Sequence, residues 1–85
     1  MTYSVVFTPT AQKQFAKAGD SRLRERIARA IEHLAAAPAV GKPLQAELKG
    51  LFSYRVGDYR IIYAFFPRKN ELVISHISHR REAYR

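Results

Sequence analysis

The stretch that decides the fold is Leu51–Phe66, with the sequence LFSYRVGDYRIIYAFF. Both of its halves are rich in β-branched and aromatic residues, and Gly57-Asp58 separates them, so it predicts two antiparallel strands joined by a tight turn. Strand alternation places one set of residues on the expected core face, namely Tyr59, Ile61, Tyr63 and Phe65. The opposite face carries Asp58, Arg60, Ile62 and Ala64. Arg60 therefore points away from the core, either as a solvent-exposed charge or as a functional group.

Upstream of this stretch, the sequence predicts a short strand followed by a helix. Tyr3–Phe7 is a β-type run. Thr8 then fits an N-cap and Pro9 the first helical position, where a missing N–H group costs nothing. We expect the helix to run from Pro9 to about Ala18 and to end at Gly19 in the left-handed conformation.

A second helix is predicted from an N-cap at Asp20 or Ser21 to about Ala37. Its apolar residues recur at helical spacing and predict a buried stripe of Leu23, Ile27, Ala30, Ile31 and Leu34. A separate flank carries Arg22, Arg26, Arg29 and His33. This flank is either a solvated face with an i,i+4 pair between Glu25 and Arg29, or a surface for an acidic partner or RNA phosphates.

The remaining segments complete the predicted order β-α-α-β-β-β. Residues 39–50 form a connection with turn signals, and residues 67–70 form a hairpin turn before a last strand from Glu71 to about Ser78. Alternation would place Leu72, Ile74, His76 and Ser78 on one face with Arg80, and Val73, Ser75, Ile77 and His79 on the other. The order favours a single α+β domain over residues 1–85, with an antiparallel sheet and an N-terminal helical hairpin packed on one of its faces.

Charge is the strongest signal in the composition. The chain has 15 Lys and Arg against 7 Asp and Glu, a net charge of +8, and arginine is twice as common as lysine. Such a surplus implies an anionic partner, either nucleic acid or an acidic protein, and arginine favours bidentate recognition of phosphate or carboxylate. A membrane surface fits less well, because the basic residues are not confined to one amphipathic helix.

Several classes of protein are disfavoured. Cysteine is absent, which excludes a disulfide framework and a cysteine-based zinc site. The three histidines lack companions at ligand spacing, so we expect neither a metal nor a cofactor. No apolar run reaches the roughly 20 residues that cross a bilayer, and no signal-peptide pattern opens the chain, so we expect a cytoplasmic protein.

Arginine and tyrosine remain as the chemistry-bearing residues, and a meander could bring several of them together: Arg55, Arg60, Arg80, Arg81 and Tyr84. Guanidinium groups around one phosphate stabilise the charge of a phosphorane-like transition state, and an aromatic ring can stack on a base. RNA supplies its own 2′-hydroxyl nucleophile, so cleavage needs positioning and management of two protons. Simple phosphate binding is the alternative.

These residues fall within a pattern that resembles the RelE/ParE toxin superfamily. The matching segments read L-x-G-L-x-x-x-R-x-G-x-Y-R-x-x-Y followed by H-R-x-x-x-Y, and with the order of elements they cover nearly the whole chain. The segments are Gly41–Leu44, Leu48–Leu51, Tyr54–Tyr63 and Ser78–Tyr84.

The resemblance implies the toxin of a bacterial type II toxin–antitoxin system. RelE-type members are ribosome-dependent mRNA interferases that cut the codon in the A site and leave a 2′,3′-cyclic phosphate and a 5′-hydroxyl. By this resemblance, Arg60 binds and polarises the scissile phosphate. Arg80 stabilises charge or protonates the leaving oxygen, and Tyr84 stacks on a base and orients the nucleophile. An acidic RelB- or ParD-like antitoxin is the implied partner, with operator DNA bound only by the complex of the two.

The chain departs from the family pattern where lysines are expected. Arg55 and Ser53 occupy the positions of a basic lysine pair, and arginine is a poor general base because it stays protonated in proteins. Either another group takes the proton, with His79, His76 or the ribosome as the candidates, or catalysis is weaker and rests on charge stabilisation alone. Further cations expected to bind RNA phosphates are Lys42, Lys49, Arg81 and Arg85.

Two other functions stay open. A ParE-type toxin poisons DNA gyrase and is a binding module with no RNase site. A stand-alone nucleic-acid-binding protein would explain the charge but not the motif, and its RNA affinity would fall steeply with salt while no cut products form.

Overall fold

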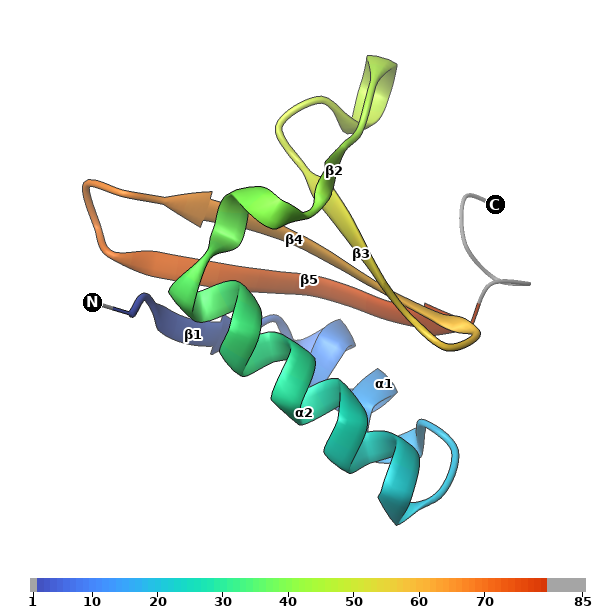
Figure 1. Cartoon of the computed structure of the whole chain (residues 1–85). Coiled ribbons are helices and arrows are strands. Elements are labelled where there is room, and N and C mark those ends of the chain that lie inside the picture. The colour runs from blue at the N-terminus through green and yellow to red at the C-terminus, as the bar shows by residue number, and fades with distance from the viewer. Residues whose placement is uncertain (1, 80–85) are drawn as a thin grey trace.

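The structure is a computed structural model that describes residues 2–79. Its elements follow the predicted order, with one short strand and two 3-10 turns added in the connection. The elements are β1 (Ser4–Phe7), α1 (Pro9–Lys17), α2 (Ser21–Ala36), η1 (Pro38–Val40), β2 (Lys42–Pro43), η2 (Ala46–Leu48), β3 (Phe52–Val56), β4 (Tyr59–Phe66) and β5 (Glu71–His79). The predicted α+β class is confirmed, with two helices against a five-stranded sheet (Figure 1). None of the helices within residues 2–79 is long and apolar enough to span a bilayer.

Both helices begin at the predicted caps. The Thr8 hydroxyl accepts a hydrogen bond from Ala11 N at 3.1 Å, ahead of Pro9 at the first helical position. The Asp20 carboxylate accepts one from Leu23 N at 2.9 Å. Between the helices, Gly19 has φ +48, the left-handed conformation that glycine adopts without steric cost. The local sequence therefore specifies the helical hairpin.

Removing the second cap should weaken the fold measurably. Asp20→Ala is expected to lower the free energy of unfolding by about 1 kcal/mol, because Leu23 N loses its partner and the charge near the helix N-terminus disappears. Urea denaturation followed by circular dichroism measures this loss. Asp20→Ser is the matched control and should stay close to wild type, since a serine hydroxyl caps nearly as well. Equal losses in both variants would contradict a capping role.

The sheet is mixed, not wholly antiparallel as predicted. Its strand order is β1-β5-β4-β3-β2, and β1 lies parallel to β5 at one edge. In the sequence, both helices lie between β1 and the other strands. This long connection allows β1 to pair in parallel with β5. The two-residue strand β2 pairs antiparallel with β3 at the other edge, where no strand was predicted. The pairs β3–β4 and β4–β5 are antiparallel, as predicted.

One hydrophobic cluster joins the helices to one face of the sheet. It contains the buried helix residues Ala11, Ile27, Ile31 and Leu34 together with the strand residues Ile61, Tyr63, Leu72, Ile74 and Ile77. Tyr59 and Phe65 pack against it, half-buried, so the core face predicted for β4 is confirmed. The other face of β4 points away from this cluster and carries Arg60.

A β-bulge in β5 overturns the predicted faces of that strand. Tyr63 pairs with Ile74, but the preceding Ile62 pairs with His76, so Ser75 is an extra residue. The extra residue reverses the alternation beyond it. His76 and Ser78 therefore lie on the face opposite the core, not beside Leu72 and Ile74 as predicted.

Tyr63 ties the connection after α2 to the sheet. The Tyr63 ring is fully buried. Its hydroxyl donates a hydrogen bond to Pro38 O and accepts one from Gly41 N at 3.0 Å. Burial raises the pKa of the Tyr63 hydroxyl above its ordinary value, while the bond from Gly41 N works against that shift. This anchor holds the backbone immediately before β2 and so helps to place Lys42 beside β3.

Candidate functional site

The sheet face away from the helices carries the two predicted arginines in register. Arg55 on β3 pairs with Arg60 on β4, so both side chains leave the sheet on the same side. On its other side Arg60 pairs with Ser78 of β5. These three residues form one row across β3, β4 and β5, close to the turn between β3 and β4.

A second row runs beside the first. Lys42 on β2 pairs with Ser53, Ser53 pairs with Ile62, and Ile62 pairs with His76. Lys42 and His76 are exposed at the two ends of this row, while Ser53 and Ile62 between them are buried. We call the two rows together the basic face; it consists of Lys42, Ser53, Arg55, Arg60, Ile62, His76 and Ser78.

The basic face is suited to an anion. Arg55 and Arg60 bring two guanidinium groups to facing positions on neighbouring strands, where both can bind one anion. Arg55 is exposed, and its Nε donates to Gly57 O at 3.1 Å, which fixes part of the side chain against the turn. Arg60 is half-buried. A phosphate bridging these guanidinium groups would accept charge-assisted hydrogen bonds from both.

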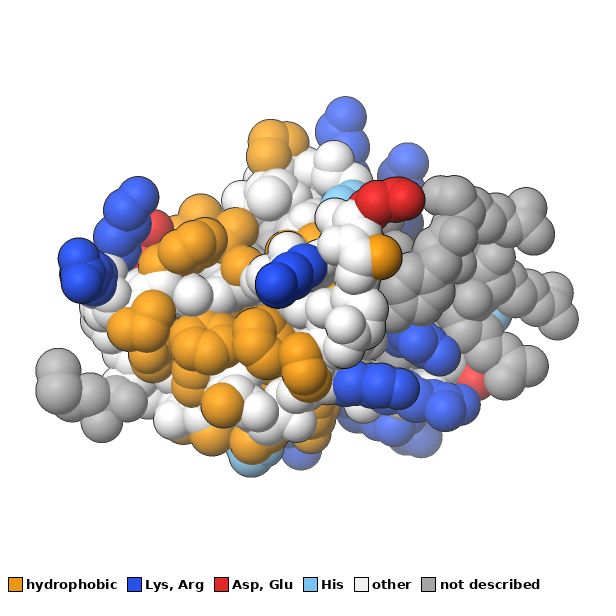
Figure 2. Space-filling model, turned by 90° about the horizontal axis from the view of Figure 1, so that it is seen from above, with side chains coloured by type: hydrophobic (Ala, Val, Ile, Leu, Met, Phe, Trp, Pro, Cys, Tyr) orange, Lys and Arg blue, Asp and Glu red, His pale blue; other side chains and the backbone are white. Residues whose placement is uncertain are grey.

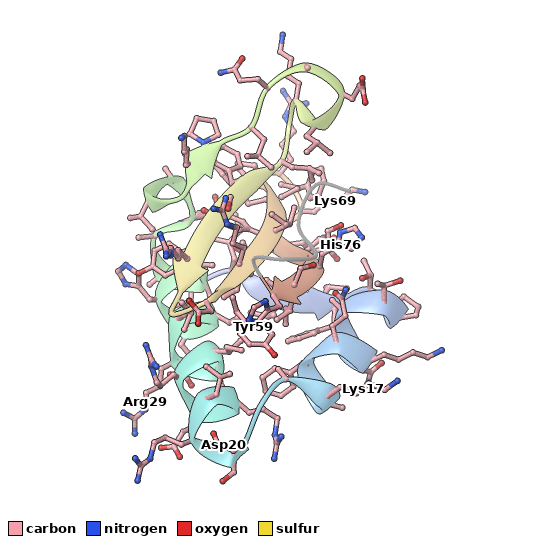
Figure 3. The ribbon with its side chains drawn as sticks, turned by 90° about the vertical axis from the view of Figure 1, so that its right-hand side faces the viewer. Lys17, Asp20, Arg29, Tyr59, Lys69 and His76 are labelled. Carbon is pink, nitrogen blue, oxygen red and sulfur yellow. The ribbon has the colours of Figure 1, made fainter. Side chains whose placement is uncertain are left out.

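The structure separates the two histidines that were candidates for proton transfer. His76 lies on the basic face, and its Nδ1 is 2.8 Å from the Ser75 hydroxyl. His79 pairs with Tyr59 on the helix side, where the two rings meet edge to face with centroids 5.3 Å apart. In Figure 3, His76 and Arg29 of α2 project to opposite sides of the molecule.

The other predicted site residues fall into two groups. Lys49 is exposed at the end of η2 and belongs to neither row of the basic face. Arg80, Arg81, Tyr84 and Arg85 lie outside the described residues. Conversely, Ser78 was not singled out from the sequence, although it is the register neighbour of Arg60. The sequence feature that could have assigned Ser78 to this face is the irregular spacing of the apolar residues Leu72, Ile74 and Ile77.

The basic flank of α2 lies next to the turn between β3 and β4. The predicted pair is present, with Arg29 Nη2 2.9 Å from Glu25 Oε1. An open hollow of about 330 Å³ lies here, lined by Ser21, Arg22, Glu25, Arg26 and Arg29. A Cβ placed on Gly57 would lie 3.7 Å from the guanidinium nitrogens of Arg26. This flank therefore reaches the turn between β3 and β4, which Arg55 also contacts through Gly57 O. His33 turns instead toward Tyr54, with ring centroids 6.0 Å apart.

Seen from above, many of the exposed apolar side chains gather in one patch (Figure 2). Figure 2 shows a hydrophobic patch and, beside it, a group of Lys and Arg side chains. Large hydrophobic residues with at least a third of their surface exposed are Val5, Val6, Val40, Leu48 and Phe66. Within residues 2–79, no three His, Asp or Glu side chains are arranged to hold a metal ion.

Comparison with known sequences identifies relatives along the full length of the chain. Residues 5–84 match the family described as the ParE toxin of the type II toxin-antitoxin system parDE. Toxin RelG of Mycobacterium tuberculosis is 38% identical over 86 residues, which cover 100% of this chain and 99% of that protein. Toxin RelE of the same organism is 37% identical over 89 residues, covering 98% and 87%.

Solved structures agree with the sequence matches. The RelBE2 toxin–antitoxin complex of M. tuberculosis contains a chain with a TM-score of 0.86 and 34% identity, covering 96% of this chain and 95% of that one. A chain of the intact Escherichia coli RelBE complex has the same fold, with a TM-score of 0.78 at 18% identity and coverage of 91% and 95%. On the strength of both comparisons, the chain belongs to the ParE toxin family of type II toxin–antitoxin systems, within the RelE/ParE superfamily.

Proposed function

We propose that this type II toxin is a ribosome-dependent mRNA endoribonuclease that cuts within the A site. The observation that carries the proposal is the facing pair Arg55 and Arg60 on the sheet face opposite the helices. Relatives named Toxin RelE and Toxin RelG, at 37% and 38% identity, support the choice of a RelE-type toxin.

In the proposed reaction the RNA supplies the nucleophile. The 2′-oxygen attacks the adjacent phosphorus and the bond to the 5′-oxygen breaks, leaving a 2′,3′-cyclic phosphate and a 5′-hydroxyl. Arg60 binds the non-bridging oxygens and stabilises the charge that develops on them, with Arg55 beside it. Lys42 holds a neighbouring phosphate as a point charge. Arg80 and Tyr84 are proposed to complete the site, through charge stabilisation or protonation of the leaving oxygen and through base stacking, and Lys49, Arg81 and Arg85 to hold flanking phosphates.

A ParE-type gyrase inhibitor is the second candidate. It is favoured by the description of the matching family as the ParE toxin of parDE. Such a toxin needs a complementary surface for gyrase but no arrangement that aligns a 2′-hydroxyl with a phosphate. The two candidates therefore predict different products from the same purified toxin.

Two assays on the same purified chain distinguish these functions. Ribosomes carrying an mRNA with an empty A site are expected to yield fragments ending in a 2′,3′-cyclic phosphate, detected by their resistance to ligation until the cyclic group is removed. DNA supercoiling by purified gyrase is expected to continue at the same toxin concentration. Inhibited gyrase together with intact mRNA would reverse this assignment and support the second candidate.

We further propose that an acidic RelB- or ParD-like antitoxin neutralises the toxin. The net charge of +8 and the exposed apolar residues Val5, Val6 and Phe66 support a partner with both acidic and hydrophobic side chains. The relatives of known structure from M. tuberculosis and E. coli are toxin–antitoxin complexes. Such a partner would stabilise this small domain by mass action, and the complex would be the species that binds operator DNA.

A further inference from the structure

We propose that His76 is the general base that deprotonates the 2′-hydroxyl, and that the bulge at Ser75 positions it for that role. This proposal rests on the endoribonuclease function proposed above. The need for such a group follows from the two positions where lysines were expected, because Ser53 and Arg55 occupy them. Neither a neutral hydroxyl nor a guanidinium accepts a proton readily near neutral pH.

The register places His76 next to the phosphate-binding arginines. His76 pairs with Ile62 and Arg60 pairs with Ser78, so His76 and Arg60 are diagonal neighbours on antiparallel strands. Diagonal neighbours on one face are separated by roughly 7–8 Å between backbones, which is within the reach of two long side chains toward one phosphodiester. His79 faces the helix side beside Tyr59 and cannot take this role without a change of register.

One ring nitrogen of His76 already has a partner. Ser75 Oγ is 2.8 Å from Nδ1, which orients the imidazole. When Nδ1 carries the proton and donates it to Oγ, Nε2 presents a lone pair to the substrate. In the reaction, Nε2 takes the proton of the 2′-hydroxyl as the O–P bond forms. The 5′-oxygen leaves with the electron pair of the broken P–O bond and takes a proton from solvent.

The bulge that turns His76 to the basic face is secured by α1 and its cap. An extra residue in a strand leaves backbone groups without their ladder partners. Here Ser75 O accepts from the Thr8 hydroxyl at 2.9 Å, and Ile77 N donates to Gln14 Oε1 at 2.7 Å. The residues on both sides of His76 are thus fixed by side chains more than 60 positions away in the sequence. Thr8 and Gln14 are positioning residues in this proposal.

Within residues 2–79, the charged side chains that β2, β3 and β4 place on the same sheet face as His76 are cationic. Arg60 on β4 is diagonal to it, Arg55 on β3 and Lys42 on β2 lie farther along the same face, and β1 brings no titratable side chain. On α1 the titratable residues are Lys13 and Lys17, and on β5 itself they are Glu71, at the far end, and His79.

The test is single-turnover cleavage of ribosome-bound mRNA as a function of pH. Wild-type toxin is expected to show a cleavage rate that rises with pH along an acidic limb, because a general base acts only in its unprotonated form. His76→Asn should cleave about 100-fold more slowly and lose that acidic limb, because general base catalysis contributes about 10²- to 10⁴-fold. The matched control is His79→Asn, whose cleavage rate should still rise with pH along the acidic limb. Since His76 is exposed, circular dichroism should show an unchanged fold.

The outcomes separate this proposal from the function on which it rests. Cleavage by His76→Asn within threefold of wild type, with the acidic limb retained, would overturn the role of His76 and leave the endoribonuclease function standing. Wild-type toxin that cuts no mRNA would instead refute that function itself. For the positioning role, Gln14→Met should lower the cleavage rate constant with little change in half-saturation by ribosomes. Gln14→Glu should restore the rate, because a carboxylate oxygen can again accept from Ile77 N. Equal rates in Gln14→Met and wild type would refute the positioning role.

Discussion

Arg60→Ala is expected to abolish growth arrest and to lower the rate of mRNA cleavage by about 10²- to 10³-fold, the loss typical when one donor to a developing oxyanion is removed. Arg60 lies on the basic face between its register partners Arg55 and Ser78. Its removal takes away the most central positive charge in the row. The core residues Ile61 and Tyr63 point to the other side of β4, so the fold should survive.

Expression of each variant at equal level, followed by growth and by primer extension on ribosome-bound mRNA, measures the effect. Arg68→Ala is the matched control, because it removes the same charge from the exposed turn between β4 and β5, at the far end of β4. It should remain toxic. Arg60→Lys should fall between the two, since a lysine keeps the charge but loses the bidentate geometry. Full growth arrest by Arg60→Ala would defeat the RNase proposal.

A double-mutant cycle extends this test to Arg80, which lies outside the described residues. If both guanidinium groups act on one phosphate, Arg80→Ala should also abolish toxicity. The combined variant should then lose far less than the product of the two single effects, because the second removal acts on a site that has already failed. If the loss in the combined variant instead equals the product of the two single losses, the two arginines act at different steps or on different phosphates.

Local chemistry explains which parts of the fold could be predicted from sequence. The caps at Thr8 and Asp20 and the left-handed Gly19 depend on neighbours within a few residues. Thr8 and Gly19 were predicted, and Asp20 was one of the two caps predicted for the second helix. The core face of β4 was predicted because its β-branched and aromatic residues indicate a strand, and strand alternation then places Arg60 opposite Tyr59, Ile61 and Tyr63. The facing pair of Arg55 and Arg60 then follows from the tight turn between them.

The errors all involve contacts between residues far apart in the chain. The parallel pairing of β1 with β5 is decided by how the helical hairpin returns the chain to the sheet, which no local pattern records. The bulge in β5 depends on Thr8 and Gln14, which satisfy the backbone around Ser75 from the other end of the sequence. For this reason strict alternation assigned His76 to the wrong face. In the sequence itself, the bulge shows only as a change in the spacing of apolar residues. Ile74 follows Leu72 by two positions, whereas Ile77 follows Ile74 by three.

Gly41→Ala is expected to destabilise the fold by about 3 kcal/mol, by breaking the anchor at Tyr63. A Cβ at residue 41 would overlap the Tyr63 hydroxyl and lie 2.9 Å from ring carbon Cζ. The ring is fully buried, so it cannot move aside without disturbing the core. Overpacking of this kind costs about 1–3 kcal/mol, and a buried hydroxyl that loses its partners costs about 1–3 kcal/mol more. For a small domain this is a large fraction of the total stability.

Urea denaturation of two further variants isolates the cause. Gly50→Ala is the matched control: its added Cβ has no neighbour within 4 Å, so it costs only the strain of φ +98, about 1 kcal/mol. Tyr63→Phe removes the hydroxyl with which the new Cβ collides. In that background Gly41→Ala should therefore cost clearly less than in the wild type, a coupling expected between residues in contact. The anchor also holds the backbone before Lys42, so Gly41→Ala should weaken RNA binding at temperatures where the variant is still folded. Additive losses for Gly41→Ala and Tyr63→Phe would show that the two groups do not depend on each other.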